Sequence, residues 1–501
     1  MKRTQAVLDW SNARAVPRLA RVVVALFALM IGGCSNLTRF GGIDTSVLAP
    51  KPERRTAATI EPSSPQQREH LRILAAYGGA YQNAKLQGML EKTVDKLVAA
   101  SERPDLKYEV TILNSPAVNA FALPNGQLYV TRGLIALAND NSELASVLAH
   151  EMAHVIARHA EIREDQARQA AVVNRVAVDL LSDPQLGALA LAKSKIALAN
   201  FSRAQEFEAD GIGVGITARA GFDPYGAARM LTALQRNANL ASPNAGSDLH
   251  TAEFMSSHPA TDDRVKNALA NARQFAAPGA GERDRAEYLA GLDGLIFGED
   301  SSEGFVRGRR FLHAKLGFTF MAPPGFTLDN TAQAVLGLKD GGREALRVDV
   351  VSVPAEQSLS DYLVSGWMEN VAPASVQAFS VNGFPAATAT AAGKDWSFRL
   401  YTVRFGSDVY RFIFAAKSMT PQADRAFRES IDSFRRMSLK ESAEVKPLRL
   451  KIVTVGPNDT VQSLAQRMSV ADHKLARFLT LNGLSPHDQV KAGSKAKMVV
   501  E

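Results

Sequence analysis

Apolar and polar residues alternate along the chain with two different periods, which predict where helices and strands lie. Between Asp140 and Ile156, apolar residues recur every three to four positions, which predicts a helix. Asp140 and Glu143 form the D-x-x-E pattern of a capping box at its start. The first half has further expected elements: one helix from about 66 that continues through 86–100, strands at 108–113, 119–123 and 127–131 with a Pro-Asn-Gly hairpin turn before the last, and helices at 186–199, from 202, at 225–236 and from 261 or 262.

The pattern changes in the second half of the chain. Residues 276–303 are rich in Gly, Pro and charge around one apolar stretch, 288–297, which indicates a linker with a docking segment. Beyond it, a small α+β domain for packing or partner binding is predicted from strand-like runs at 318–321, 346–353, 387–391, 397–405 and 409–415 and from helical runs at 359–371 and 421–436. The last segment has a strand, helices at 462–468 and about 472–481, and a closing strand at 497–500.

The N-terminal residues have the composition of a secretion signal. A basic stretch ends at Arg21, about ten apolar residues follow at 22–31, and two glycines precede Cys34. This apolar run is short for a membrane span and typical of a signal peptide. Cys34 is the only cysteine, so an internal disulfide is excluded, and its context resembles a bacterial lipobox, in which the cysteine is lipidated. A signal peptide with a stray thiol, or an uncleaved anchor, remains the alternative. By that resemblance, Ser35 favours the outer over the inner membrane.

The charge of the chain does not indicate nucleic-acid binding. The formal net charge is +7, but residues 1–33 hold five Lys or Arg and a single acidic residue, so most of the excess lies in the leader. The 501 residues, 46% of them hydrophobic and 22% charged, suit a globular protein of about three domains.

The helix that starts at Asp140 carries the strongest chemical signal, H-E-x-x-H at His150–His154. Residues four apart lie about 40° apart around a helix axis, so His150 and His154 can share one Zn²⁺ ion. Glu151 is placed to act on a zinc-bound water, whose pKa falls to about 7. The alternative is a surface helix with two ordinary histidines.

A zinc site of this kind needs a third protein ligand from another element. The helix expected from Ser202 carries Glu206 and Asp210 on one face. Glu206 can bind the metal, and Asp210 can accept the free N–H of a ligating histidine. His159 has the wrong helical spacing from His154 and is expected to be a solvated helix residue, and Glu208 points away from Glu206 as a solvated charge.

Together these blocks resemble the HtpX/CAAX-prenyl-protease family of zinc endopeptidases. The resemblance rests on the H-E-x-x-H helix, on Arg203, Glu206, Ala209 and Asp210, and on the strand pair at 119–134, and it covers roughly residues 68–275. It implies a mostly helical, gluzincin-type domain with His150, His154 and Glu206 as zinc ligands and Glu151 as general base. The lack of several transmembrane helices makes it similar to the soluble periplasmic branch.

A second block, Ser257-His258-Pro259, precedes the helix that holds Arg264. In the branch just named the matching histidine can take the open metal position, so the resemblance implies that His258 is a regulatory fourth ligand. A loop histidine that caps a helix is the alternative. Arg264 is a candidate to polarise the scissile carbonyl or to stabilise the oxyanion, or it is structural.

The last segment resembles a LysM domain in its β-α-α-β order, its P-x-D-T opening and its N-G-L middle. The resemblance implies binding to glycans such as peptidoglycan, although Asn458 replaces the usual glycine before Asp459. A small αβ tail without a ligand is the alternative. The region before it faintly resembles PsbP-like modules.

The sequence therefore predicts an α+β, lipid-anchored periplasmic Zn²⁺ endopeptidase that cleaves unfolded or misassembled envelope proteins. A different class of answer is a non-catalytic envelope chaperone or peptidoglycan-binding scaffold with a structural zinc, closed by His258 as the fourth ligand. The expected parts are a signal peptide with lipobox at 1–33, a flexible tether at 34–66, the zinc metalloprotease domain at 67–275, a linker at 276–304, the α+β domain at 305–440 and the LysM-like domain at 448–501.

Overall fold

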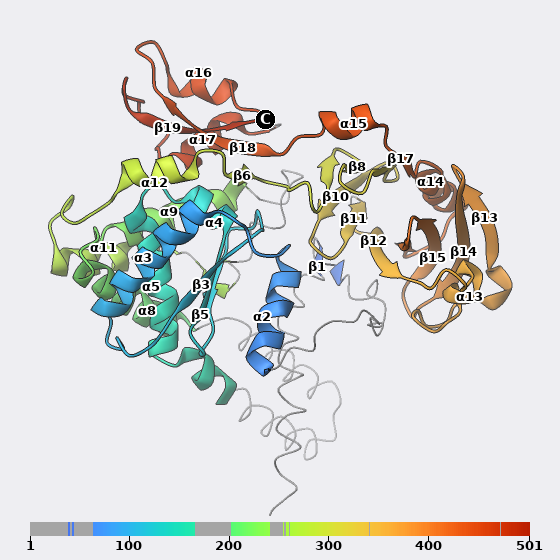
Figure 1. Ribbon diagram of the computed structural model, residues 1–501, viewed down its shortest axis with the longest axis horizontal. Coiled ribbons are helices and arrows are strands. Elements are labelled where there is room, and N and C mark those ends of the chain that lie inside the picture. The colour runs from blue at the N-terminus through green and yellow to red at the C-terminus, as the bar shows by residue number, and fades with distance from the viewer. Residues whose placement is uncertain are drawn as a thin grey trace, which may run out of the picture. The chain divides into compact units, whose positions relative to one another are not determined.

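The computed structural model of the chain describes residues 39–40, 43–44, 64–165, 202–240, 254, 257–259, 261–339, 341–470 and 472–501 (Figure 1). Two short antiparallel strands, β1 (Arg39–Phe40) and β2 (Ile43–Asp44), lie in the unit Met1–Ala49, and all other elements lie in the unit Pro50–Glu501. Among the described residues, no helix is both long enough and apolar enough to cross a membrane. The predicted helix at 186–199 and Cys34 lie outside the described residues.

The single long helix expected from residue 66 is wrong, because two helices occupy this stretch. Helix α2 (Pro65–Ala76) ends before Gly78 and Gly79, which have φ of 77° and 90°, and helix α3 (Ala84–Ala100) starts at a new N-cap, Asn83. Glycine takes positive φ at little cost, and such residues interrupt a helix. The break lets Ala80 pair with Leu113.

A three-stranded sheet follows, with the order β3-β5-β4. Strands β3 (Glu109–Leu113) and β5 (Gln127–Thr131) are parallel, and β4 (Ala120–Ala122) pairs with β5 as the antiparallel hairpin that the sequence predicts. The turn uses Gly126 at φ 88°, where a Cβ atom would lie 2.1 Å from the carbonyl oxygen of Lys107. Strand β4 is therefore an edge strand, and it packs beside the H-E-x-x-H helix.

Helix α4 (Arg132–Leu137) leads into the H-E-x-x-H helix, α5 (Asn141–Ile156), which is buried on all sides from Asn141 to His154. The Asp140 side chain caps the backbone N–H of Glu143 at 3.0 Å, as predicted. The return contact of the capping box differs, because the Glu143 carboxylate accepts from the backbone N–H of Asn139 at 2.8 Å and not from that of Asp140. Asp140 and Glu143 also bind Arg229, which anchors the start of α5 to the next helices.

Helices α8 (Arg203–Arg219) and α9 (Gly226–Leu240) pack against α5, and α11 (Asp262–Phe275) packs against α8 and α9. Helix α8 begins at the predicted N-cap Ser202 with a full capping box to Gln205. It approaches α5 closely at Gly213, where a Cβ atom would lie 3.0 Å from the backbone nitrogen of His150. This close approach brings Glu206 and the two histidines of α5 within reach of one another.

The stretch expected to be a linker carries α12 (Arg285–Leu292) and β6 (Ile296–Phe297). Tyr288, Leu289 and Leu292 are buried in the same core as α5. Strand β6 pairs with β18, near the C-terminus. The apolar stretch thus docks, as predicted, and it also joins the C-terminal segment to the core around α5.

The C-terminal segment has the predicted β-α-α-β order: β18 (Leu448–Thr454), α16 (Val461–Gln466), α17 (Lys474–Leu481) and β19 (Lys495–Val500). Strands β18 and β19 are antiparallel. The side chain of Lys497 is fully buried, and its Nζ atom donates to the carbonyl oxygens of Ala136, Leu137 and Ala138 at 2.8, 3.1 and 2.8 Å. This segment is therefore attached to the end of α4, just before α5.

Residues 305–440 form two antiparallel sheets over a core rich in phenylalanine. One sheet has the order β10-β11-β12-β16-β15-β14-β13 and the other β17-β9-β8-β7. The bounds are β7 (Phe305–Arg307), β8 (Arg310–His313), β9 (Phe318–Met321), β10 (Phe326–Asn330), β11 (Val335–Lys339), β12 (Glu344–Ser352), β13 (Gln377–Val381), β14 (Phe384–Ala392), β15 (Ser397–Phe405), β16 (Asp408–Ala416), β17 (Arg435–Arg436), α13 (Leu359–Leu363), η5 (Pro373–Ser375), α14 (Pro421–Asp432) and α15 (Leu439–Glu444).

The five predicted strands of this region are present, and so is most of the helix predicted at 421–436. The helix predicted at 359–371 is wrong after Val364. Gly366 and Asn370, with φ of 92° and 55°, take left-handed conformations that a right-handed helix excludes.

Candidate metal centre

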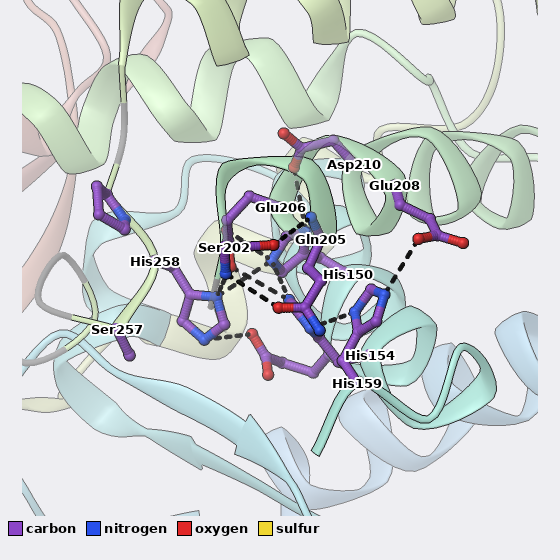
Figure 2. Close-up of polar contacts among 12 residues, drawn as sticks. His150, His154, His159, Ser202, Gln205, Glu206, Glu208, Asp210, Ser257 and His258 are labelled. Carbon is purple, nitrogen blue, oxygen red and sulfur yellow. Dashed lines mark hydrogen bonds and ion pairs between the residues drawn. The ribbon is translucent and has the colours of Figure 1, made fainter. Parts of the chain in front are cut away.

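Three elements bring four potential metal ligands together in the buried space beside α5 (Figure 2). Helix α5 supplies His150 and His154, helix α8 supplies Glu206, and His258 comes from the segment just before α11. One ligand atom from each of the four lies within 4.8 Å of all the others, and all four residues are buried. Phe254 stacks on the His258 ring at 4.9 Å, and its carbonyl oxygen accepts from the His258 backbone N–H at 2.8 Å.

Four of the separations between these atoms are close to those of a tetrahedral metal site. Zinc–ligand bonds of 2.0–2.1 Å place neighbouring ligand atoms of a tetrahedron about 3.3 Å apart. The Nε2 atom of His150 lies 3.1 Å from Nε2 of His154 and 3.4 Å from Nδ1 of His258. Glu206 Oε1 lies 2.9 Å from His258 Nδ1 and 3.5 Å from His154 Nε2. The donor set of three imidazoles and one carboxylate is one that Zn²⁺ accepts.

Asp210 lies next to His150, one of the two candidate ligands on α5. Its Oδ1 atom lies 3.1 Å from His150 Nδ1, the ring nitrogen that faces away from the ligand group. A carboxylate here fixes the tautomer of a metal-binding histidine.

Arg264 is buried and makes all its described contacts with protein acceptors. Its Nε and Nη2 atoms donate to the two carboxylate oxygens of Asp210 at 2.8 and 2.7 Å. Its Nη1 atom lies 2.6 Å from Glu206 Oε2 and donates to the Pro259 carbonyl at 3.2 Å. Of the two roles that the sequence left open for Arg264, these contacts favour the structural one.

The protonation of the site follows from its burial and its charges. Burial opposes the charged form of His150, but the hydrogen bonds to Asp210 and Glu206 raise its pKa to about 9. Burial and the neighbouring imidazoles lower the pKa of His154. Burial tends to raise the pKa of Glu206, but the hydrogen bonds to His150 and His258 outweigh it and lower this pKa. A metal ion binds the neutral forms of His150 and His154 and the ionised form of Glu206. Metal binding would therefore displace the proton from His150.

Glu151 lies next to this group on α5 and is buried. Its Oε1 atom has no hydrogen-bond partner among the described residues, and His258 Nε2 lies 3.8 Å from it. Burial raises the pKa of the Glu151 carboxyl group. A buried carboxylate oxygen without a partner is costly, which indicates that it serves a ligand or a water molecule.

His159 lies in a helical stretch, as expected, but the expectation that it is solvated is wrong. His159 is 1% exposed, and its Nδ1 atom lies 2.9 Å from His154 Nδ1. The expectation assumed one continuous helix, but α5 ends at Ile156 and Arg158 turns the chain with a φ of 55°. Glu208 is exposed, as expected, but it also contacts His159 Nε2 at 3.3 Å. No spacing rule in the sequence reveals this contact, because it depends on the turn.

Comparison with known proteins identifies the domain that holds this centre. The family description "Peptidase family M48" matches residues 84–272. The chain is 29% identical over 284 residues to mitochondrial metalloendopeptidase OMA1 of Schizosaccharomyces pombe, covering 52% of this chain and 77% of that protein. It is 31% identical over 189 residues to the β-barrel assembly-enhancing protease of Escherichia coli strain K12, covering 36% of this chain and 37% of that protein. The prediction of a zinc metalloendopeptidase is confirmed at the level of this domain.

The chain spans well under half the length of the β-barrel assembly-enhancing proteases that it matches, 43% in Vibrio cholerae and 37% in Escherichia coli. The solved structure of cyanobacterial PsbP from Synechocystis sp. PCC 6803 matches 28% of the chain at 15% identity with a TM-score of 0.21. The PsbP-like and LysM-like resemblances stay predictions.

Proposed function

Residues 84–272 form a peptidase family M48 domain, and on this premise we propose that the chain is a periplasmic zinc endopeptidase that cleaves unfolded or misassembled envelope proteins. The observation that carries the proposal is the position of Glu151, a buried carboxylate beside four potential metal-ligand atoms, whose Oε1 atom has no hydrogen-bond partner among the described residues. A structural zinc site has no use for such a group.

His150, His154 and Glu206 hold the metal in this proposal. Bound zinc supplies a Lewis acid that polarises the peptide carbonyl and lowers the pKa of a bound water to about 7. Glu151 takes the proton from the attacking water and delivers it to the amine that leaves when the C–N bond breaks. Asp210 and Arg264 keep His150 and Glu206 in position through the contacts described above.

Strand β4 is the candidate site for the substrate backbone. It is the edge of its sheet and packs beside α5, so an extended peptide that pairs with it passes close to His150 and Glu151. Pairing with an edge strand uses main-chain hydrogen bonds and therefore accepts many sequences, provided that the substrate is unfolded. This geometry supports unfolded polypeptides as substrates.

His258 acts as a regulatory fourth ligand in this account. Its Nδ1 atom faces Glu206 and its Nε2 atom faces Glu151, so the ring occupies the space between the third ligand and the base. A water molecule that Glu151 activates needs that same space. Displacement of His258 then opens the site.

The anchor and the C-terminal segment complete the proposal. Cys34 carries the lipid that holds the enzyme at the outer membrane, and residues 448–501 bind peptidoglycan if they act as a LysM domain. Both rest on the sequence resemblances given above.

A second candidate is a non-catalytic envelope chaperone or peptidoglycan-binding scaffold with a structural zinc. One observation favours it: four protein ligands close the site, as they do in structural zinc centres. The position of Glu151 favours the enzyme.

Digestion of a permanently unfolded protein, such as reduced and alkylated lysozyme, tests the proposal. The purified chain without residues 1–33 is compared with Glu151→Gln, which keeps the ligands and removes the base. We expect zinc-dependent cleavage by the wild type and a loss of about 10²–10⁴-fold in the variant. Equal rates contradict the role of Glu151, and binding of zinc by both without any cleavage supports the scaffold or a closed site.

A further inference from the structure

The two histidines of α5 differ in what lies behind them. The outward nitrogen of His150 meets a carboxylate directly, that of Asp210 at 3.1 Å. The outward nitrogen of His154 meets another imidazole, that of His159 at 2.9 Å. The second nitrogen of His159 then meets Glu208 at 3.3 Å (Figure 2). The Zn²⁺ ligands of the proposed function thus have different supports.

If His154 and His159 are both neutral, their ring nitrogens allow one consistent placement of the two protons. His154 Nε2 faces the ligand group, 3.1 Å from His150 Nε2, so a metal there leaves the proton of His154 on Nδ1. This Nδ1–H donates to His159 Nδ1, which must accept. The proton of His159 is then on Nε2, where it donates to the Glu208 carboxylate. Each nitrogen has one role, and no donor faces another donor.

The backbone conformation at Arg158 brings His159 into contact with His154. Arg158, at φ 55°, ends the H-E-x-x-H helix in a left-handed conformation that costs a non-glycine residue about 1–2 kcal/mol. The turn places His159 against the last turn of α5, with the rings of His154 and His159 inclined at 71° and 4.9 Å apart. Its neighbours Arg158 and Ala160 are exposed, whereas His159 is buried.

Helix α8 contributes one residue to the metal-ligand group and another to the far side of His159. Glu206 is a member of the ligand group, and Glu208, two residues later, holds the far side of His159. The Glu208 side chain is 59% exposed. Its contact with His159 therefore contributes little to stability, as exposed ion pairs generally do. The same helix thus fixes the metal side and the outer side of His154.

We propose that His159 is a positioning residue that fixes the tautomer and ring orientation of His154, and that Glu208 holds His159 for this task. The inference rests on the proposed function in one respect, that His154 binds the metal. It does not require that the chain cleaves peptides. Outer partners of metal-binding histidines contribute about 10–100-fold to metal affinity.

The test measures zinc affinity by competition with a chromophoric chelator. His159→Phe keeps an aromatic ring and removes both nitrogens, so we expect the dissociation constant for zinc to rise about 10–100-fold. His159→Asn keeps an acceptor near the position of Nδ1, and we expect it to stay within a few-fold of the wild type. A value for His159→Phe equal to that of the wild type overturns the proposal, as does an asparagine variant as weak as the phenylalanine variant.

Glu208→Gln provides a second variant that does not disturb the core. We expect weaker zinc binding than in the wild type, together with a changed visible absorption spectrum of the Co²⁺-substituted protein. Asp263→Asn is the matched control, because Asp263 on α11 is an exposed carboxylate that pairs with Arg203 on α8, the helix that also holds Glu208. Equal zinc affinity and equal Co²⁺ spectra for Glu208→Gln and Asp263→Asn overturn the proposal.

Proteolysis is measured on the same samples so that the two proposals fail separately. Tight zinc binding by a wild type and by a His258→Ala variant that both cleave nothing contradicts the endopeptidase function and leaves the role of His159 to the affinity series. Cleavage by a wild type whose zinc affinity does not respond to His159 or Glu208 supports the function and overturns the role of His159.

Discussion

The Nε2 atom of His258 lies 3.8 Å from the Oε1 atom of Glu151, which has no hydrogen-bond partner among the described residues. The proposed general base therefore faces the proposed fourth ligand, and in this account the His258 ring competes with the water molecule that Glu151 would activate. The structure corresponds to a closed form of the enzyme in this account, and removal of the His258 ring opens it.

The contact between α5 and α8 sets the geometry of the ligands. A Cβ atom at Gly213 would lie 3.0 and 3.1 Å from the backbone nitrogen and Cα of His150, so Gly213→Ala must move α8 away from α5. We expect the free energy of unfolding to fall by about 1–3 kcal/mol and zinc affinity to fall with it. Urea unfolding and chelator competition measure the two effects.

Gly211 is the control on the same helix, because a Cβ atom there would meet only the Asn271 side chain at 3.7 Å. We expect Gly211→Ala to bind zinc normally and to be more stable by up to about 1 kcal/mol, through helix propensity alone. Indistinguishable zinc affinities for the two alanine variants would show that the close approach does not matter.

Arg264 is expected to hold the site together and not to act on substrate. Replacement by methionine leaves Asp210 and Glu206 buried without their cation, and we expect the zinc-free chain to lose about 3–5 kcal/mol of stability. Arg203→Met, which breaks an exposed ion pair with Asp263, should cost no more than about 1 kcal/mol. An Arg264→Met chain that unfolds like the wild type but has lost kcat would instead assign Arg264 to the transition state.

Lys497 makes the attachment of the C-terminal segment sensitive to pH. Burial lowers the pKa of its ammonium group from the ordinary 10.5 to about 7, even though Glu143 acts in the opposite direction. Between these values the unfolded chain binds a proton that the folded chain does not. Stability therefore rises with pH across this window, by up to about 1.4 kcal/mol for each pH unit, and the cost is fully present below pH 7.

Lys497→Met removes this dependence. The unfolding free energy of the wild type minus that of the variant should therefore increase from pH 7.5 to 9.5. Lys495→Met, an exposed residue on the same strand, serves as control and should show no such trend. A flat difference for Lys497→Met would mean that the three carbonyl groups and Glu143 keep the ammonium charged throughout.

The parts of the structure that follow from local sequence were predictable. The helix with His150 and His154 has its own N-cap and apolar spacing, and the hairpin before it has its own glycine turn. The grouping of Glu206 with the histidines was predictable as well, because a zinc site with two histidines on one helix needs a third ligand from another element. The matching family added His258, which local pattern alone leaves as a loop residue.

The remaining features depend on contacts between distant residues or on single backbone conformations. The pairing of β6 with β18 joins residues about 150 positions apart, and no periodicity encodes such a partner. The burial of His159 depends on the left-handed turn at Arg158, a residue type that gives no signal for such a turn. The break between α2 and α3 was readable from Gly78 and Gly79, but helical periodicity on both sides concealed it.

Cleavage of a permanently unfolded protein by His258→Ala, beside the double variant His258→Ala/Glu151→Gln, tests the central claim most directly, with the zinc content of each sample measured. The account predicts that the single variant keeps zinc and cleaves at least several-fold faster than the wild type, and that the double variant keeps zinc and loses this activity by about 10²-fold or more. A zinc-loaded single variant that cleaves no faster than the wild type, or a double variant that cleaves as fast as the single one, would contradict it.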